Sequence, residues 1–149
     1  MEKMPTQIAE FIHQQHIVSL ACQQNGELWC ANCFYAFDEA NSRLILLTDK
    51  KTKHAQFMLN NPYIAGTIAY QTENIREIEG IQFQGIAKNL DSPLAQQALE
   101  IYWKRHPIAK LRPSDVWEIQ FTQIKHTTNK YLFAQKTVWQ PTLQKTGES

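Results

Sequence analysis

Short β-type segments separated by polar turns constrain the fold of this chain more than any other feature. Residues 17–23 (IVSLACQ) and 28–37 (LWCANCFYAF) flank the dipeptide Asn25-Gly26. Asn and Gly tolerate the positive φ angles of a two-residue turn, so this pattern predicts a β-hairpin. A second polar turn at residues 38–42 leads to residues 43–48 (RLILLT), which complete a predicted antiparallel meander.

The rest of the chain also favours strands. Further strands are expected at residues 63–70, 76–89, 116–122 and 130–139. Helices are expected from near Pro5 to residue 16, from about Thr52 to Asn60, and from a cap at Ser92-Pro93 to about Arg105. Six or so mostly antiparallel strands with three short helices predict a mainly β protein, a closed or partly closed β-barrel with peripheral helices.

Length and charge set bounds on domain number and partners. The 149 residues are expected to form one domain over residues 1–149, with a polar tail from about residue 140. The formal net charge of +1 gives no bulk attraction to nucleic acid or to a membrane surface. No apolar run approaches the ~20 residues that span a bilayer, and the polar N-terminus predicts no export signal. A cytoplasmic protein with reduced thiols is therefore expected.

A basic turn, Thr48-Asp49-Lys50-Lys51-Thr52-Lys53-His54, joins a predicted strand to a predicted helix. A helix N-terminus carries about half a positive charge, so lysines are unfavourable there unless an anion is bound. A phosphate could accept hydrogen bonds from the Thr52 hydroxyl, from backbone N–H groups and from the lysine ammonium groups. The alternative is a solvated basic turn, and composition does not decide between the two.

Other reactive side chains give weaker signals. Cys30 and Cys33 form a CxxC motif inside a predicted strand, where residues three apart face opposite sides, so a structural role is favoured over a metal or redox site. Glu77 and Glu79 are expected at an exposed strand edge. The five histidines are scattered and no nucleophile motif is present, so the sequence identifies no catalytic residue, and we predict no metal site.

The order of the elements resembles that of the pyridoxamine 5′-phosphate oxidase-like split barrels. The segments ELWCANCFYAFD, KTKHAQ, GIQFQG and VWEI are most similar to the YhbP-like branch of that superfamily. The resemblance covers roughly residues 5–139. It implies an antiparallel FMN-binding split barrel that forms a homodimer with the flavin at the interface, and a small-molecule substrate that the sequence does not identify.

The resemblance also implies positions for the cofactor. The family's phosphate-binding turn falls on Thr52, Lys53 and His54, with Lys51 as an additional cation. The positions expected beside the ring or the ribityl chain are Thr48, Gln82 and the segment Trp29, Cys30, Ala31 and Asn32, with Tyr35 further along the same strand. Cys30 and Tyr35 stand where the oxidase has basic residues, and His54 stands where it has a lysine.

These features predict an FMN-binding, oxidoreductase-like protein in which the flavin performs the electron chemistry. The alternatives are a non-enzymatic module that binds flavin, haem or a related planar anion, and a structural dimer that has lost its flavin. The oxidase pattern of paired arginines around a histidine is absent from residues 129–139 (NKYLFAQKTVW). We therefore do not expect this chain to be the vitamin-producing oxidase.

Overall fold

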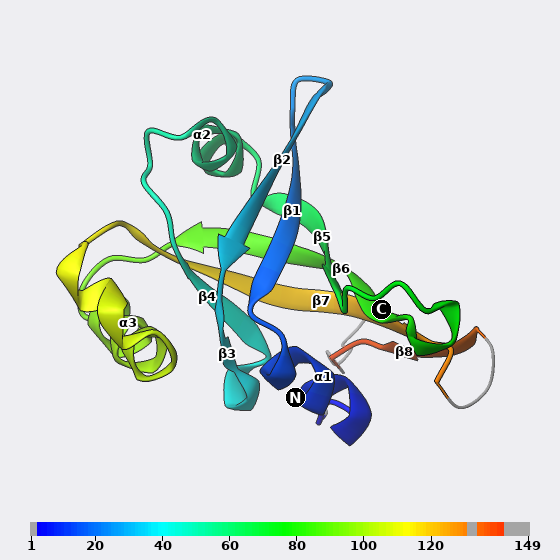
Figure 1. The fold of residues 1–149 in the computed structure, drawn as a ribbon. Coiled ribbons are helices and arrows are strands. Elements are labelled where there is room, and N and C mark those ends of the chain that lie inside the picture. The colour runs from blue at the N-terminus through cyan, green and yellow to red at the C-terminus, as the bar shows by residue number, and fades with distance from the viewer. Residues whose placement is uncertain (1–2, 131–133, 142–149) are drawn as a thin grey trace.

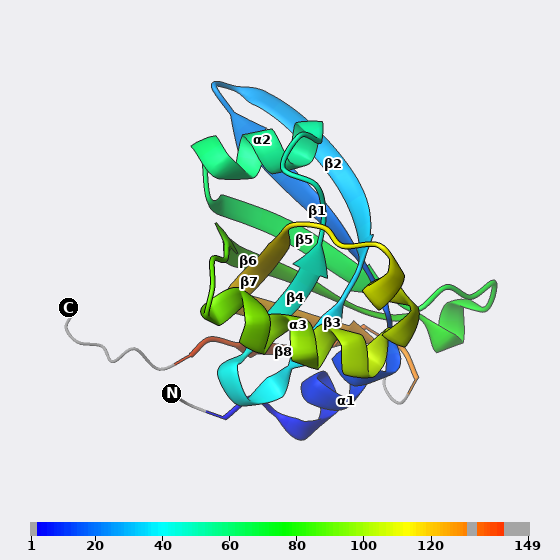
Figure 2. The same ribbon diagram turned by 90° about the vertical axis from the view of Figure 1, so that its left-hand side faces the viewer.

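An eight-stranded antiparallel sheet curls around an apolar core, and three α-helices lie around it (Figures 1 and 2). The computed structural model describes residues 3–130 and 134–141. Across the sheet the strand order is β2-β1-β5-β6-β7-β4-β3, and β8 pairs with β7. This confirms the predicted mainly β, antiparallel split-barrel architecture with peripheral helices.

The elements have the following bounds within the described residues. The strands are β1 (Ile17–Gln24), β2 (Glu27–Phe34), β3 (Ala36–Asp38), β4 (Arg43–Leu47), β5 (Tyr63–Ala69), β6 (Glu79–Asn89), β7 (Val116–Thr128) and β8 (Gln135–Trp139). The α-helices are α1 (Thr6–Gln14), α2 (Lys53–Asn60) and α3 (Leu94–Arg105), and the 3-10 helices are η1 (Glu39–Asn41), η2 (Ile75–Glu77) and η3 (Pro107–Leu111). No helix among these is long and apolar enough to cross a membrane.

The β1–β2 hairpin forms as predicted and projects from the barrel (Figure 1). Asn25 and Gly26 have φ angles of 50° and 82°. Positive φ at both central positions is the geometry that matches the twist of two paired strands. Along β1 the side chains alternate, so that Val18, Leu20 and Cys22 face the core while their neighbours face outward.

The predicted strand over residues 28–37 is interrupted at Tyr35. Its first half is β2, which pairs with β1, and its second half is β3, which pairs with β4. Tyr35 itself is only 1% exposed; its hydroxyl donates to the Ile12 carbonyl at 2.6 Å and its N–H to the His16 carbonyl at 3.0 Å. The predicted antiparallel pairing of the three segments is confirmed, since β1 pairs with β2 and β3 pairs with β4. The expectation of one continuous middle strand is wrong, because its two halves lie at opposite ends of the strand order.

Several other boundaries differ from the prediction. β6 begins at Glu79 because residues 75–77 form a 3-10 turn, in which the side chain of Asn74 accepts from the Arg76 N–H. β7 extends to Thr128 because it pairs with β6 along nearly all its length. The cap of α3 is Pro93 and makes no side-chain cap hydrogen bond. Residues 131–133 of the predicted last strand, and the tail from residue 142, lie outside the described residues.

The core joins α1 to the inner face of the sheet. Its fully buried members include Ile8 and Ile12 of α1 and Leu44, Ile119 and Phe121 of the strands. A hydrophobic core of this kind supplies most of the free energy that favours folding. Trp117, 1% exposed, donates its Nε1–H to the Thr48 carbonyl at 3.0 Å and so connects this core to the basic turn.

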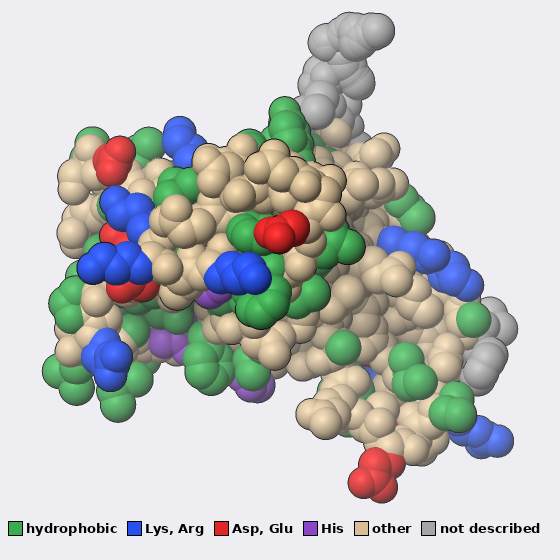
Figure 3. Space-filling view, turned by 90° about the horizontal axis from the view of Figure 1, so that it is seen from above, with side chains coloured by type: hydrophobic (Ala, Val, Ile, Leu, Met, Phe, Trp, Pro, Cys, Tyr) green, Lys and Arg blue, Asp and Glu red, His purple; other side chains and the backbone are tan. Residues whose placement is uncertain are grey.

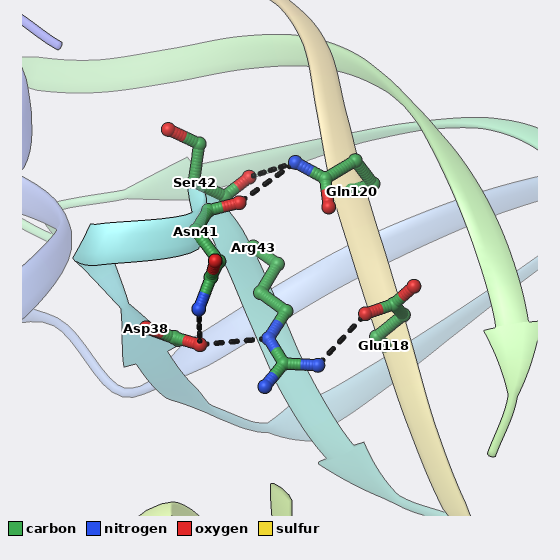
Figure 4. A network of polar contacts seen from close by, with 6 residues as sticks. All are labelled: Asp38, Asn41, Ser42, Arg43, Glu118 and Gln120. Atoms are coloured by element: carbon green, nitrogen blue, oxygen red, sulfur yellow. Dashed lines mark hydrogen bonds and ion pairs between the residues drawn. The ribbon is translucent and has the colours of Figure 1, made fainter. Parts of the chain in front are cut away.

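A polar network fastens the β3–β4 corner to β7 (Figure 4). Arg43 donates from Nε to Asp38 at 2.8 Å and from a terminal nitrogen to Glu118 at 2.8 Å. Asn41 also donates to Asp38, and Gln120 donates to the Asn41 carbonyl at 2.7 Å. Because the arginine lies between two carboxylates, each of them has a charge-assisted hydrogen bond to the same guanidinium group.

Replacement of Tyr35 by Phe tests the anchor at the strand break. The change removes the hydroxyl and leaves the Ile12 carbonyl without that donor, so we expect the free energy of unfolding in urea to fall by about 1–2 kcal/mol. Tyr70→Phe is the matched control, since Tyr70 is 37% exposed and its contact with Lys130 is made by the ring, which Phe keeps, and it should change stability by less than about 0.5 kcal/mol. Equal effects of the two changes would show that the buried hydroxyl is not an anchor.

Candidate functional site

The basic turn is a compact structure between the end of β4 and the start of α2. Thr52 is the N-cap of α2: its Oγ1 accepts from the Ala55 N–H at 3.2 Å, and its hydroxyl donates to the Asp49 carbonyl at 2.9 Å. The Asp49 carboxylate accepts from the Lys51 N–H at 2.7 Å. Within the described residues the N–H groups of Lys53 and His54 donate to no backbone acceptor, as is normal in a first helical turn.

His54 brings the two ends of this turn together. Its Nε2 lies 2.8 Å from Oγ1 of Thr48 and 3.3 Å from Oγ1 of Thr52. Burial lowers the pKa of His54 below its ordinary value of 6.5. The imidazole is therefore neutral at physiological pH and acts there as a hydrogen-bonding group, whereas a lysine at this position would carry a full charge.

Strand β2 lies beside this turn, and a cation–π contact links the two. Nζ of Lys53 lies 4.0 Å from the centroid of the Trp29 ring and 5.9 Å from that of Phe57. Both ribbon views place α2 next to the β1–β2 hairpin (Figures 1 and 2). Viewed from above, basic side chains at this end lie next to exposed hydrophobic ones (Figure 3).

The predicted positions on β2 are divided between two faces of the sheet. Trp29 pairs with the buried Cys22 and faces the core side, which Ala31 shares. Cys30 and Asn32 face outward, and Asn32 accepts from the Ser19 hydroxyl at 2.6 Å. Trp29 and Ala31 therefore lie on the side of the sheet that faces the basic turn, whereas Cys30 and Asn32 lie on the opposite side.

Gln82 lies on the same outward side as Asn32. The register aligns Asn32 with Ser19, Ser19 with Thr67 and Thr67 with Gln82, so Asn32 and Gln82 occupy one row across β2, β1, β5 and β6. Tyr35 joins neither group, because it is a core residue whose hydroxyl is bound to Ile12. Burial raises the pKa of the Tyr35 hydroxyl well above its ordinary value, so the phenol stays protonated.

On the outward side of these four strands the only charged side chain is that of Lys88, near the end of β6, a feature that was not predicted from the sequence. We call the uncharged part of this side the outer face; its members are Ile17, Ser19, Ala21, Gln23, Leu28, Cys30, Asn32, Phe34, Tyr63, Ala65, Thr67, Ala69, Gly80, Gln82, Gln84 and Ile86. A cavity of about 420 Å³ opens on it between Leu28 and Tyr63. Leu28, Phe34 and Tyr63 are each more than half exposed. Alternation within each predicted strand was the signal that could have found it.

The remaining reactive groups are distributed as follows. Cys30 is exposed whereas Cys33 packs against the core, and all three cysteines are free thiols. Among the described residues no group of His, Cys, Asp and Glu is arranged to hold a metal ion. The expectation that Glu79 lies at an exposed edge is wrong: its side chain is 15% exposed and pairs with His126. The reason is that Glu79 points to the same side of β6 as the buried Ile81.

Comparison with known sequences identifies close relatives. No protein-family model matches the chain. A UPF0306 protein of Haemophilus ducreyi is 46% identical over 142 residues, covering 94% of this chain and 97% of the relative. A UPF0306 protein of Yersinia pseudotuberculosis is 39% identical over 132 residues, covering 89% of this chain and 90% of the relative.

Comparison with solved structures identifies the fold. A FAD-binding protein from Mesorhizobium loti superposes with a TM-score of 0.69 at 14% identity, over 80% of this chain and 89% of the other. A candidate pyridoxamine 5′-phosphate oxidase from Listeria innocua has a TM-score of 0.63 at 17% identity, over 79% and 93%. A haem-binding protein from Mycobacterium smegmatis has a TM-score of 0.70 at 13% identity over 85% of this chain, which spans about half of that protein.

The lowered pKa of His54 predicts a pH dependence of stability. Its folded pKa lies below the unfolded value of 6.5, so the unfolded chain takes up a proton first as the pH falls. The contribution of His54 is complete above about pH 6.5 and is lost as the pH falls through 6.5 toward the folded pKa. The stability of the wild type relative to His54→Gln, measured by urea unfolding, should therefore decrease on acidification. A difference that stays constant with pH would contradict this.

Proposed function

Since the chain belongs to the UPF0306 family and has a split-barrel fold, we propose that it binds flavin mononucleotide (FMN), with the phosphate at the basic turn, and acts as an oxidoreductase-like protein. The observation that carries the proposal is the turn itself. It presents the N–H groups of Lys53 and His54 and the lysine cations at the start of one helix, whose N-cap is Thr52. N–H groups and ammonium groups together are what a phosphate accepts hydrogen bonds from.

Each residue of the turn has a distinct part in this proposal. Lys51 is exposed and supplies a mobile charge, whereas Lys53 is already oriented by the Trp29 ring. His54 is held in place by its contacts with Thr48 and Thr52 and would supply a hydrogen bond at a fixed position. Thr52 keeps the turn in shape, since its hydroxyl donates to the Asp49 carbonyl and accepts from the Ala55 N–H. A bound phosphate dianion favours the protonated form of His54, so binding should strengthen as the pH falls toward the pKa of the imidazole in the complex.

The flavin ring needs a surface with polar groups but little charge, and Trp29 and Ala31 offer one on the turn side of β2. Asn32 and Gln82 offer amide groups on the opposite side of the sheet, the outer face, where they would contact a flavin held by a second copy of the chain. When bound, the flavin would supply the electron chemistry. The protein's own residues then need only hold the cofactor and control access to it, with a small molecule as substrate.

We also propose that the outer face is the surface of a homodimer. It extends over four strands with charged side chains only at its border, Lys88 of β6 and Lys125 of β7, and Leu28, Phe34 and Tyr63 are exposed on it. Soluble monomers seldom expose such a surface, and depletion of charge is the signature of an interface core. Because Asn32 and Gln82 belong to this face, a flavin bound near them would contact both copies of the chain.

Replacement of two lysines tests the phosphate site. Lys51→Ala with Lys53→Ala should weaken FMN binding by about 10- to 100-fold for each charge-assisted bond that is lost, in a fluorescence titration. The matched control is Lys104→Ala with Lys110→Ala, which removes the same charge at α3 and η3, where Lys110 also lies over a tryptophan ring. We expect His54→Lys to tighten binding and to remove its pH dependence. Equal affinities of the two double variants would move the phosphate elsewhere.

Two spectroscopic results separate this proposal from its alternatives. The fold similarity to a haem-binding protein makes haem the second candidate, and the absorbance spectra of the flavin-loaded and haem-loaded protein differ. Reduction of bound flavin by NADH or NADPH with turnover would support an enzyme over a non-enzymatic carrier. A purified protein that binds neither added FMN nor added haem would leave only a structural dimer.

Sedimentation tests the dimer. The wild type should sediment at twice the chain mass of 17.3 kDa. Ser19→Arg places a charge in the middle of the outer face and should give a monomer, because an unpaired charge is costly to bury at an interface. Glu100→Arg on the exposed side of α3 is the control and should leave the dimer intact. A monomeric wild type would overturn this part of the proposal.

A further inference from the structure

The outward side of β7 carries a lysine, Lys125, at the border of the outer face. It pairs with Gln82 of β6 on one side and with Val138 of β8 on the other. Directly opposed side chains in a sheet point to the same side, so Lys125 stands next to Gln82. Lys88 of β6 and Lys136 of β8 point to this side too and are exposed, whereas Lys125 is half-buried.

No carboxylate balances the charge of Lys125. Within the described residues its side chain makes no ion pair and no hydrogen bond. The outward side chains around it are also uncharged; they are Gln82, Gln123, Thr127 and Val138. An ammonium group that is partly removed from water without a partner costs free energy, so an uncharged side chain would serve the fold as well. A negatively charged group from outside this chain would give the lysine a reason.

The proposed flavin site brings such a group to this place. In the proposed homodimer Gln82 contacts the flavin held by a second copy, and Lys125 is the direct neighbour of Gln82. Reduction of a flavin takes two electrons and one proton from a donor such as a reduced nicotinamide, and it leaves one negative charge on the ring. A cation beside the ring therefore stabilises the reduced form more than the oxidised form.

We propose that Lys125 of one copy lies beside the ring of the flavin held by the other copy and raises the reduction potential of that flavin. This inference rests on the proposed flavin site and on the proposed dimer. Lys125 acts through its charge alone, since it forms no covalent bond and transfers no proton. Each site then combines the basic turn of one copy with Gln82 and Lys125 of the other, so a monomer holds only an incomplete site.

The reduction potential of bound FMN tests the proposal. In Lys125→Gln the ratio of the affinities for reduced and oxidised FMN should fall about tenfold, as expected for loss of one charged neighbour. For a two-electron couple this fall lowers the potential by about 30 mV, measured in a spectroelectrochemical titration. Lys125→Arg keeps the charge and should keep the potential of the wild type.

Lys88→Gln is the matched control, because it removes an exposed lysine from the same side of the sheet at the other end of β6. It should leave the potential unchanged. If Lys125→Gln binds FMN with the potential of the wild type, this inference fails while the proposed phosphate site stands. If the wild type does not bind FMN, the proposed function fails, and this inference fails with it.

Mixed dimers show which copy supplies the lysine. In the first dimer one chain carries Lys51→Ala with Lys53→Ala and the other carries Lys125→Gln. FMN then occupies the intact turn of the second chain, faces the intact Lys125 of the first, and should have the potential of the wild type. In the second dimer all three changes are in one chain, and the FMN held by the wild-type chain should have the lower potential. The reverse pattern would refute a contribution across the interface.

The flavin-free protein provides an independent test. Lys125→Gln should leave the Tm of this form unchanged or higher, because no described residue loses an ionic partner. Sedimentation should show that the variant is still a dimer. A Tm that falls further than in Lys88→Gln would show that the fold itself requires the lysine, and it would overturn the proposal.

Discussion

The structure depends on one covalent constraint, the single residue that separates β2 from β3. These strands are neighbours in the chain, yet they lie at the two ends of the strand order. Tyr35 therefore joins the two edges of the sheet, and the sheet has to curl for its ends to meet. All of its polar groups are bound: the N–H to His16, the hydroxyl to Ile12, and the carbonyl oxygen to a ring N–H of His106 at 2.8 Å.

This closure is what creates the candidate site. The basic turn follows β4 near one edge of the sheet, whereas Trp29 belongs to β2 at the other edge. The cation–π contact of Lys53 with Trp29 joins these two edges. The indole N–H of Trp117 donates a hydrogen bond to the Thr48 carbonyl and so fixes the start of the basic turn. In an open sheet with the same strands, the turn would remain an isolated basic loop. Curling also leaves the outer face of β1, β2, β5 and β6 as a broad uncharged surface.

Much of the local structure could be predicted from the residues alone. The Asn25-Gly26 hairpin, the helix that begins at Thr52 and the alternation of β1 and β5 depend on interactions between residues close in sequence. The YhbP-like resemblance identified the split barrel, which the fold comparisons confirm. The anion site stays a prediction, although Thr48, Thr52 and His54 do form one hydrogen-bonded cluster.

The sequence by itself determined the hairpin, the capped basic turn and the mainly β character, because φ preferences, capping and side-chain alternation act over a few residues. Only the tertiary structure decided that the strand breaks at Tyr35, that β4 pairs with β7, and that Glu79 turns inward to His126. These outcomes depend on which apolar surfaces meet across the barrel. Such contacts join residues far apart in the chain, and no local pattern contains them.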